Sequence, residues 1–130
     1  MNGLHLIADL HECRCQPGFL LDAPGLEKFC VDACIRHGLS VVGRLFHPFT
    51  DLDGKPAGVT GTVVLAESHL AVHTWPEIAG VTLDVYVCNF NGDNSQRAHA
   101  LFAEVIDAFA PTRSEKKEVA RGHLRLPSNN

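Results

Sequence analysis

The chain has 130 residues, of which 45% are hydrophobic and 20% are charged, as is typical of a single soluble globular domain. Eleven lysines and arginines against fifteen acidic residues give a formal net charge of −4, which argues against electrostatic binding to nucleic acid or to an anionic membrane. The apolar runs are shorter than the ~20 residues of a membrane-spanning helix, and the N-terminus lacks a secretory signal. We therefore expect a cytoplasmic protein whose five cysteines stay reduced.

The first half of the chain predicts a strand, a helix and a second strand. Residues 4–11 alternate apolar and polar side chains, the period of a strand with one buried face. Asp22 can cap a helix whose apolar residues follow at helical spacing until Gly38. The apolar, β-branched segment 39–46 favours a strand, and residues 51–58 have the Gly, Pro and Asp content of an exposed loop.

The second half predicts three strands, a helix and an edge strand. The strands cover residues 60–67, 69–75 and 81–90, and an apolar stripe at helical spacing follows over 98–109. The charged segment 114–121 fits an edge strand, because its lysines and glutamates discourage pairing with another sheet. This order predicts an α+β two-layer sandwich, with helices on one face of a largely antiparallel sheet, in a single domain.

A polar segment, residues 67–77, interrupts this β-rich sequence. If it is extended, His69 and His73 lie on one face of its strand. An antiparallel strand starting at Val81 would then bring Cys88 back toward Ser68. On that strand Cys88 falls on the polar face, which argues against a merely buried structural cysteine.

These residues resemble the S-adenosylmethionine decarboxylase proenzymes of the short prokaryotic type. The resemblance rests on Glu67-Ser68-His69, on His73-Thr74-Trp75-Pro76-Glu77, and on Cys88, twenty residues after Ser68. It extends over nearly the whole chain, through Gly3-Leu4-His5-Leu6, Phe46-His47-Pro48-Phe49, Gly58-Val59-Thr60-Gly61 and the stretch from Lys117-Glu118 to Arg121-Gly122. The combined spacing of Ser68, His73 and Cys88 is more specific than any single piece.

The resemblance implies a proenzyme that cleaves itself between Glu67 and Ser68. The Ser68 hydroxyl would attack the Glu67 carbonyl and turn the amide into an ester, and β-elimination would then free the Glu67 carboxylate. The remainder of Ser68 would lose ammonia and become a covalent pyruvoyl group, the cofactor of the enzyme. The products would be a β chain of residues 1–67 and an α chain of residues 68–130.

The same resemblance gives roles to five further side chains. His73 would accept a proton during processing, and Thr60, where family members often have serine, would supply a hydroxyl to the processing intermediate. Cys88 would return a proton to the substrate after carbon dioxide leaves, a step that suits a thiol because its ordinary pKa is ~8.5. Phe49 and Glu77 would contact the substrate, the aromatic ring through adenine or the sulfonium and the carboxylate through ribose hydroxyls.

The implied reaction is decarboxylation of S-adenosylmethionine, whose product donates the aminopropyl group in spermidine synthesis. The pyruvoyl carbonyl would form a Schiff base with the substrate amine and withdraw electrons from the bond that breaks. The resemblance also implies that the two cleaved chains stay together and that processed units pair as homodimers, with active sites near the interface.

Two other functions stay open at this point. The same scaffold and chemistry could act on L-arginine or L-ornithine, because the processing residues do not distinguish these substrates. An unprocessed metal-binding or regulatory module is also possible, since His69 and His73 are four residues apart. The cysteines that could add a thiolate site are Cys13, Cys15, Cys30 and Cys34. Neither pattern matches a Cys-x-x-Cys zinc knuckle, so we assign no metal.

Overall fold

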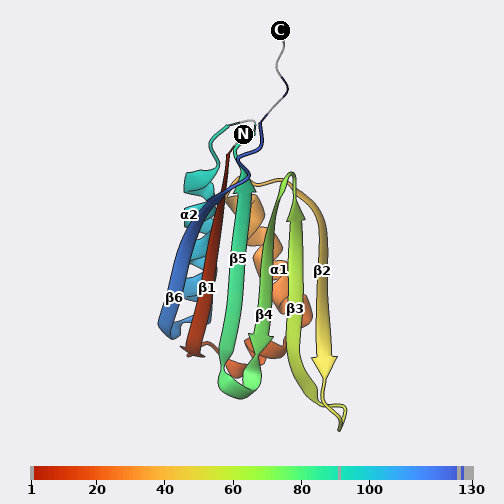
Figure 1. The fold of residues 1–130 in the computed structure, drawn as a ribbon. Helices are drawn as coiled ribbons and strands as arrows, with labels where there is room; N and C mark the ends of the chain where they lie inside the picture. The colour runs from red at the N-terminus through yellow and green to blue at the C-terminus, as the bar shows by residue number, and fades with distance from the viewer. Residues whose placement is uncertain (1, 91, 126, 128–130) are drawn as a thin grey trace.

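The computed structural model describes residues 2–90, 92–125 and 127, and shows one six-stranded sheet with two α-helices on one of its faces (Figure 1). The strands are β1 (Gly3–Cys13), β2 (Val41–Thr50), β3 (Pro56–Leu65), β4 (Ser68–Trp75), β5 (Gly80–Cys88) and β6 (Pro111–Arg121). The helices are α1 (Ala23–Arg36) and α2 (Ser95–Phe109), and the 3₁₀ turns are η1 (Pro17–Leu21) and η2 (Pro76–Ile78). None of the described helices is long and apolar enough to cross a membrane.

All neighbouring strands pair antiparallel, in the order β2-β3-β4-β5-β1-β6. This arrangement confirms the predicted two-layer α+β sandwich. The Asp22 side chain caps α1 as predicted, by accepting a hydrogen bond of 3.0 Å from the Gly25 backbone N–H. The edge strand β6 begins at Pro111 instead of residue 114, because it pairs with β1 along the whole of that strand. A proline fits this first position, where no ladder hydrogen bond is lost.

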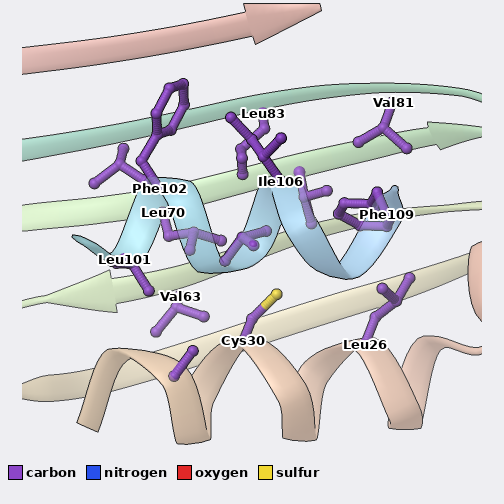
Figure 2. Close-up of a cluster of buried hydrophobic side chains, with 14 of the residues drawn as sticks. Leu26, Cys30, Val63, Leu70, Val81, Leu83, Leu101, Phe102, Ile106 and Phe109 are labelled. Atoms are coloured by element: carbon purple, nitrogen blue, oxygen red, sulfur yellow. The ribbon is translucent and has the colours of Figure 1, made fainter. Parts of the chain in front are cut away.

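The core lies between the helices and the sheet (Figure 2). The apolar stripe of α2 is buried as its spacing predicts. Leu26 and Cys30 of α1 and Leu70 of β4 are also fully buried against it. Packing at this interface holds β4 and β5, the two strands that carry the polar segment and Cys88, in fixed register.

The buried core at β4 allows a prediction about stability. Leu70 is fully buried and Leu52 is fully exposed, at 0% and 106%. We expect Leu70→Ala to lower the free energy of unfolding by about 2–5 kcal/mol, through lost burial and a cavity. The same change at Leu52 should cost less than about 0.5 kcal/mol. Guanidinium unfolding measures both, and equal effects would contradict the described core.

The other face of the sheet is open, because no element among the described residues covers it (Figure 1). It carries the polar face of β5 and the histidines of β1 and β4. It also exposes large apolar side chains, namely Leu45, Phe49, Val64, Trp75 and Val119. An uncovered face that mixes half-buried titratable groups with exposed apolar ones is typical of an interaction surface.

Candidate active site

Ser68 and Cys88 lie side by side at one end of the sheet. The register of β4 against β5 brings the first residue of β4 next to the last residue of β5. The Cys88 backbone N–H donates a hydrogen bond of 3.2 Å to Ser68 Oγ. Both residues line a cavity of about 280 Å³, together with Glu67, Asn94 and Arg97. The structure therefore confirms that the antiparallel strand returns Cys88 to Ser68.

The peptide bond before Ser68 follows a residue in an unfavourable backbone conformation. The sequence predicts Glu67 within a strand, but β3 ends at Leu65 and the turn to β4 contains Ala66 and Glu67. Glu67 has φ +61°, in the left-handed region, which costs a residue with a Cβ about 1–2 kcal/mol. Glu12, Ala79 and Ala110 share this left-handed conformation, but Glu67 alone of the four precedes the bond at which the resemblance implies cleavage.

Cys88 lies on the predicted face but is more buried than expected. It follows the same alternation as Asp84 and Tyr86, yet only 7% of its surface is exposed. The prediction that Cys88 would not be buried, because it lies on the polar face of its strand, is therefore wrong. The physical reason is its place between paired strands at the end of β5, where Gly3 pairs with it and the Asn94 side chain donates to its carbonyl at 3.0 Å.

Thr60 and His73 form a second pair, at a different position on the sheet. They are register partners on β3 and β4, and Thr60 Oγ1 lies 3.1 Å from His73 Nδ1 on the open face. His73 follows Ser68 by five residues on one extended strand, which separates their backbones by about 16 Å. Within one chain, the structure brings Ser68 to Cys88 and Thr60 to His73, but it does not bring the two pairs together.

The two predicted substrate contacts lie at the His73 end of the sheet. Phe49 is near the end of β2, is 47% exposed, and contacts His47 edge-on with ring centroids 4.7 Å apart. Glu77 is exposed in the 3₁₀ turn after β4 and lines a shallow cavity with Asp51. Neither side chain is near Ser68 of its own chain, because β2 and β4 both run away from that end (Figure 1).

Comparison with known proteins identifies the family of this chain. Residues 4–122 match the model of the S-adenosylmethionine decarboxylase family. The chain belongs to this family.

Two relatives and a solved structure are similar to this chain over nearly its whole length. It is 35% identical to the S-adenosylmethionine decarboxylase proenzyme of Syntrophomonas wolfei, over 96% of this chain and 90% of that protein. It is 34% identical to the proenzyme of Methanococcus maripaludis, over 95% and 93%. The crystal structure of the Aquifex aeolicus adenosylmethionine decarboxylase superposes with a TM-score of 0.80 at 30% identity, covering 98% of this chain and 97% of that one. The fold, like the sequence, is therefore similar to that of the family.

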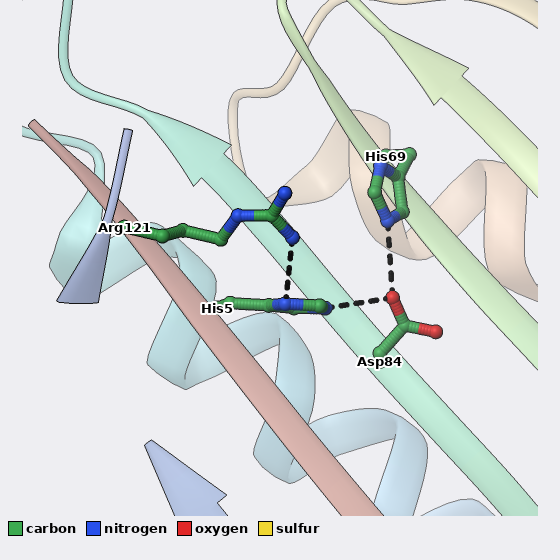
Figure 3. Close-up of polar contacts among 4 residues, drawn as sticks. All are labelled: His5, His69, Asp84 and Arg121. Atoms are coloured by element: carbon green, nitrogen blue, oxygen red, sulfur yellow. Dashed lines mark hydrogen bonds and ion pairs between the residues drawn. The ribbon is translucent and has the colours of Figure 1, made fainter. Parts of the chain in front are cut away.

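A polar network on the open face, toward the Ser68 end of the sheet, was not predicted from the sequence (Figure 3). Asp84 Oδ2 lies 2.9 Å from His5 Nε2 and 3.0 Å from His69 Nε2, and Arg121 Nη1 lies 3.0 Å from His5 Nδ1. The polar alternation of β5 was the available signal for Asp84. Its partners come from β1, β4 and β6, and only the strand register brings them together.

This network is close enough for a metal ion, but its hydrogen bonding disfavours one. The His5, His69 and Asp84 ligand atoms lie within 4.8 Å of one another. An arginine can only donate, so His5 Nδ1 accepts from Arg121 and the neutral ring carries its proton on Nε2, where it donates to Asp84. A histidine that ligates a metal instead offers a lone pair from the nitrogen that faces the ion and donates a hydrogen bond through its other nitrogen.

The structure also shows how the histidines and two of the cysteines considered as metal ligands are arranged. His69 and His73 lie on one strand, four residues and about 13 Å apart, so they cannot share an ion. Cys30 and Cys34 are fully buried in α1. Burial raises the pKa of both thiols to about 12, as expected of protonated thiols packed in a core.

Proposed function

We propose that this chain is a proenzyme that cleaves itself between Glu67 and Ser68 and then decarboxylates S-adenosylmethionine. The observation that supports this most directly is the shared cavity of Ser68 and Cys88, beside the strained turn at Glu67. The Ser68 hydroxyl, next to the bond to be broken, would be the nucleophile. Cys88, whose backbone N–H contacts the Ser68 hydroxyl in the same cavity, would be the proton donor.

The two products would remain one folded unit. Cleavage after Glu67 would divide the sheet between β3 and β4, which pair from Thr60 opposite His73 to Leu65 opposite Ser68. The α chain would also supply β5 and β6, which enclose β1 of the β chain. Backbone hydrogen bonds and the common core therefore support the expected pairing of residues 1–67 with residues 68–130.

The site suits a small group derived from Ser68. A pyruvoyl group supplies an electron sink for loss of carbon dioxide from an α-amino acid. Ser68 lines the cavity of about 280 Å³, in which a substrate amine would meet the group derived from it. Cys88 lines the same cavity and would hold the proton that the substrate carbon needs after decarboxylation.

A second copy of the chain would complete this site. The Thr60–His73 pair, Phe49 and Glu77 lie at the opposite end of the sheet from Ser68 and Cys88. If two open faces pack together about a twofold axis that runs across the strands, each Ser68 end meets the partner's His73 end. The exposed apolar side chains of this face support such packing. Light scattering should give twice the mass of one processed unit, and a monomer would contradict this pairing.

The substrate assignment is tested by carbon dioxide release. The relatives reported above are named for S-adenosylmethionine, so arginine and ornithine are not favoured. With each compound labelled in its carboxyl group, we expect release from S-adenosylmethionine alone, leaving the aminopropyl donor for spermidine synthesis. Release only from arginine or ornithine would overturn the substrate, and release from none would overturn the enzyme.

Cys88→Ser should separate processing from turnover. The variant keeps the backbone N–H that contacts Ser68 Oγ, so it should still form two chains. It replaces the thiol by a much weaker acid, and we expect carbon dioxide release to fall about 10²-fold or more. Cys15→Ser, at the far end of the sheet, is the matched control and should have little effect. Unchanged turnover in Cys88→Ser would exclude the thiol as proton donor.

A further inference from the structure

Arg97 is the one basic residue among the described residues that line the Ser68–Cys88 cavity. It lies in the first turn of α2, and its Nη1 donates a hydrogen bond of 3.1 Å to Asn94 Oδ1. Its guanidinium also packs over Gly38, where an added Cβ would lie 3.3 Å from Arg97 Nε. In the part of the chain that the structure describes, Arg97 forms no ion pair with a carboxylate.

The Asn94 side chain connects this guanidinium to the reacting residues. Its amide N–H donates to the Cys88 carbonyl at 3.0 Å, and the Cys88 N–H donates to Ser68 Oγ at 3.2 Å. Hydrogen bonds on either side of the Cys88 backbone therefore link Arg97, through Asn94, to the Ser68 oxygen. The cation is held at the cavity without an ion pair among the described residues, although the acidic residue Glu67 lines the same cavity.

Self-cleavage would create a negative charge at this point. In the first step the bond from Ser68 Oγ to the Glu67 carbonyl carbon forms, the C–N bond breaks, and the hydroxyl proton passes to the freed amine. In the second step a base removes the α-proton of residue 68, and the Cβ–Oγ bond breaks with its electron pair going to oxygen. The Ser68 oxygen thus becomes part of the Glu67 carboxylate, inside the cavity that Arg97 lines.

We propose that Arg97 binds the main-chain carboxylate of Glu67 as it forms and so accelerates the elimination step. This inference rests on the proposed self-cleavage. An arginine matches a carboxylate in both charge and geometry, and the Cys88 N–H already contacts one of the two oxygens. Removing one donor from a developing oxyanion typically costs 10²–10³ in rate. Arg97 is exposed, so solvent screens part of its charge, and we expect an effect at the lower end of this range or below it, about 10- to 100-fold.

The test follows cleavage of freshly synthesised proenzyme over time, with and without hydroxylamine. Arg97→Gln should cleave about 10- to 100-fold more slowly than the unmodified chain. Because the block falls after the ester, hydroxylamine should convert the waiting chain into Glu67 hydroxamate and an α chain beginning with intact serine. Arg97→Lys keeps the charge and should recover much of the rate. Arg36→Gln, at an arginine that pairs with Glu104 and does not line the cavity, is the control and should cleave normally.

Each outcome decides the proposal. Cleavage of Arg97→Gln at the unmodified rate would overturn it, while the proposed function would stand. Slow cleavage without trapping by hydroxylamine would place the block before the ester and would also overturn it. Arg97→Gln in a Ser68→Ala chain should melt like Ser68→Ala alone, and a large loss of melting temperature there would assign Arg97 to folding instead. If the unmodified chain never cleaves, it is the proposed function that fails.

Discussion

Replacement of Ser68 by alanine is expected to abolish both self-cleavage and decarboxylation. The substitution removes the only oxygen that the proposed acyl shift uses, and no pyruvoyl group can form from alanine. Intact-mass spectrometry should show one chain of 130 residues, and no carbon dioxide should be released from S-adenosylmethionine.

Ser40→Ala is the matched control for this change. Ser40 also lines the cavity, and its backbone carbonyl accepts a hydrogen bond from the Ala66 N–H, a contact that the substitution keeps. The Ser40 variant should cleave as the unmodified chain does. Two chains from Ser68→Ala, or one chain from Ser40→Ala, would show that the nucleophile has been misassigned.

Mixing two inactive chains is expected to restore cleavage. His73→Ala alone should slow processing about 10²-fold or more, because the proton acceptor of the elimination is lost. In a mixed dimer, Ser68 of the His73→Ala chain would meet His73 of the Ser68→Ala chain. With a mass tag on one of them, only the His73→Ala chain should be cleaved.

This experiment separates two locations for His73. The distance of about 16 Å along β4 predicts that His73 acts on the partner and not on its own Ser68. If the mixed preparation stays uncleaved while forming dimers, the second copy does not complete the site. If the Ser68→Ala chain were cleaved instead, the proposed nucleophile would be wrong.

Much of the fold could be predicted from periodicity. The apolar stripe of α2 and the alternation of β1 and β5 are local patterns, and local patterns report which face of an element is buried. The turn at Glu67 could not be predicted in this way, because its neighbours are β-rich and only the backbone angles show the left-handed residue.

Only part of the candidate site could be predicted from the sequence. The spacing of Ser68 and Cys88 fits an antiparallel return, so their proximity followed from strand order. The spacing of Ser68 and His73 suggested a shared site, but five residues along a strand hold two side chains far apart. Arg97 and Asn94 come from the next helix, and their approach to Cys88 depends on how α2 packs on the sheet.

Intact-mass spectrometry of the purified protein tests most directly whether this chain processes itself at Ser68. We predict two chains, residues 1–67 and 68–130, the second carrying a pyruvoyl group in place of a free N-terminal amine. A single unprocessed chain of 130 residues in correctly folded protein would contradict the account.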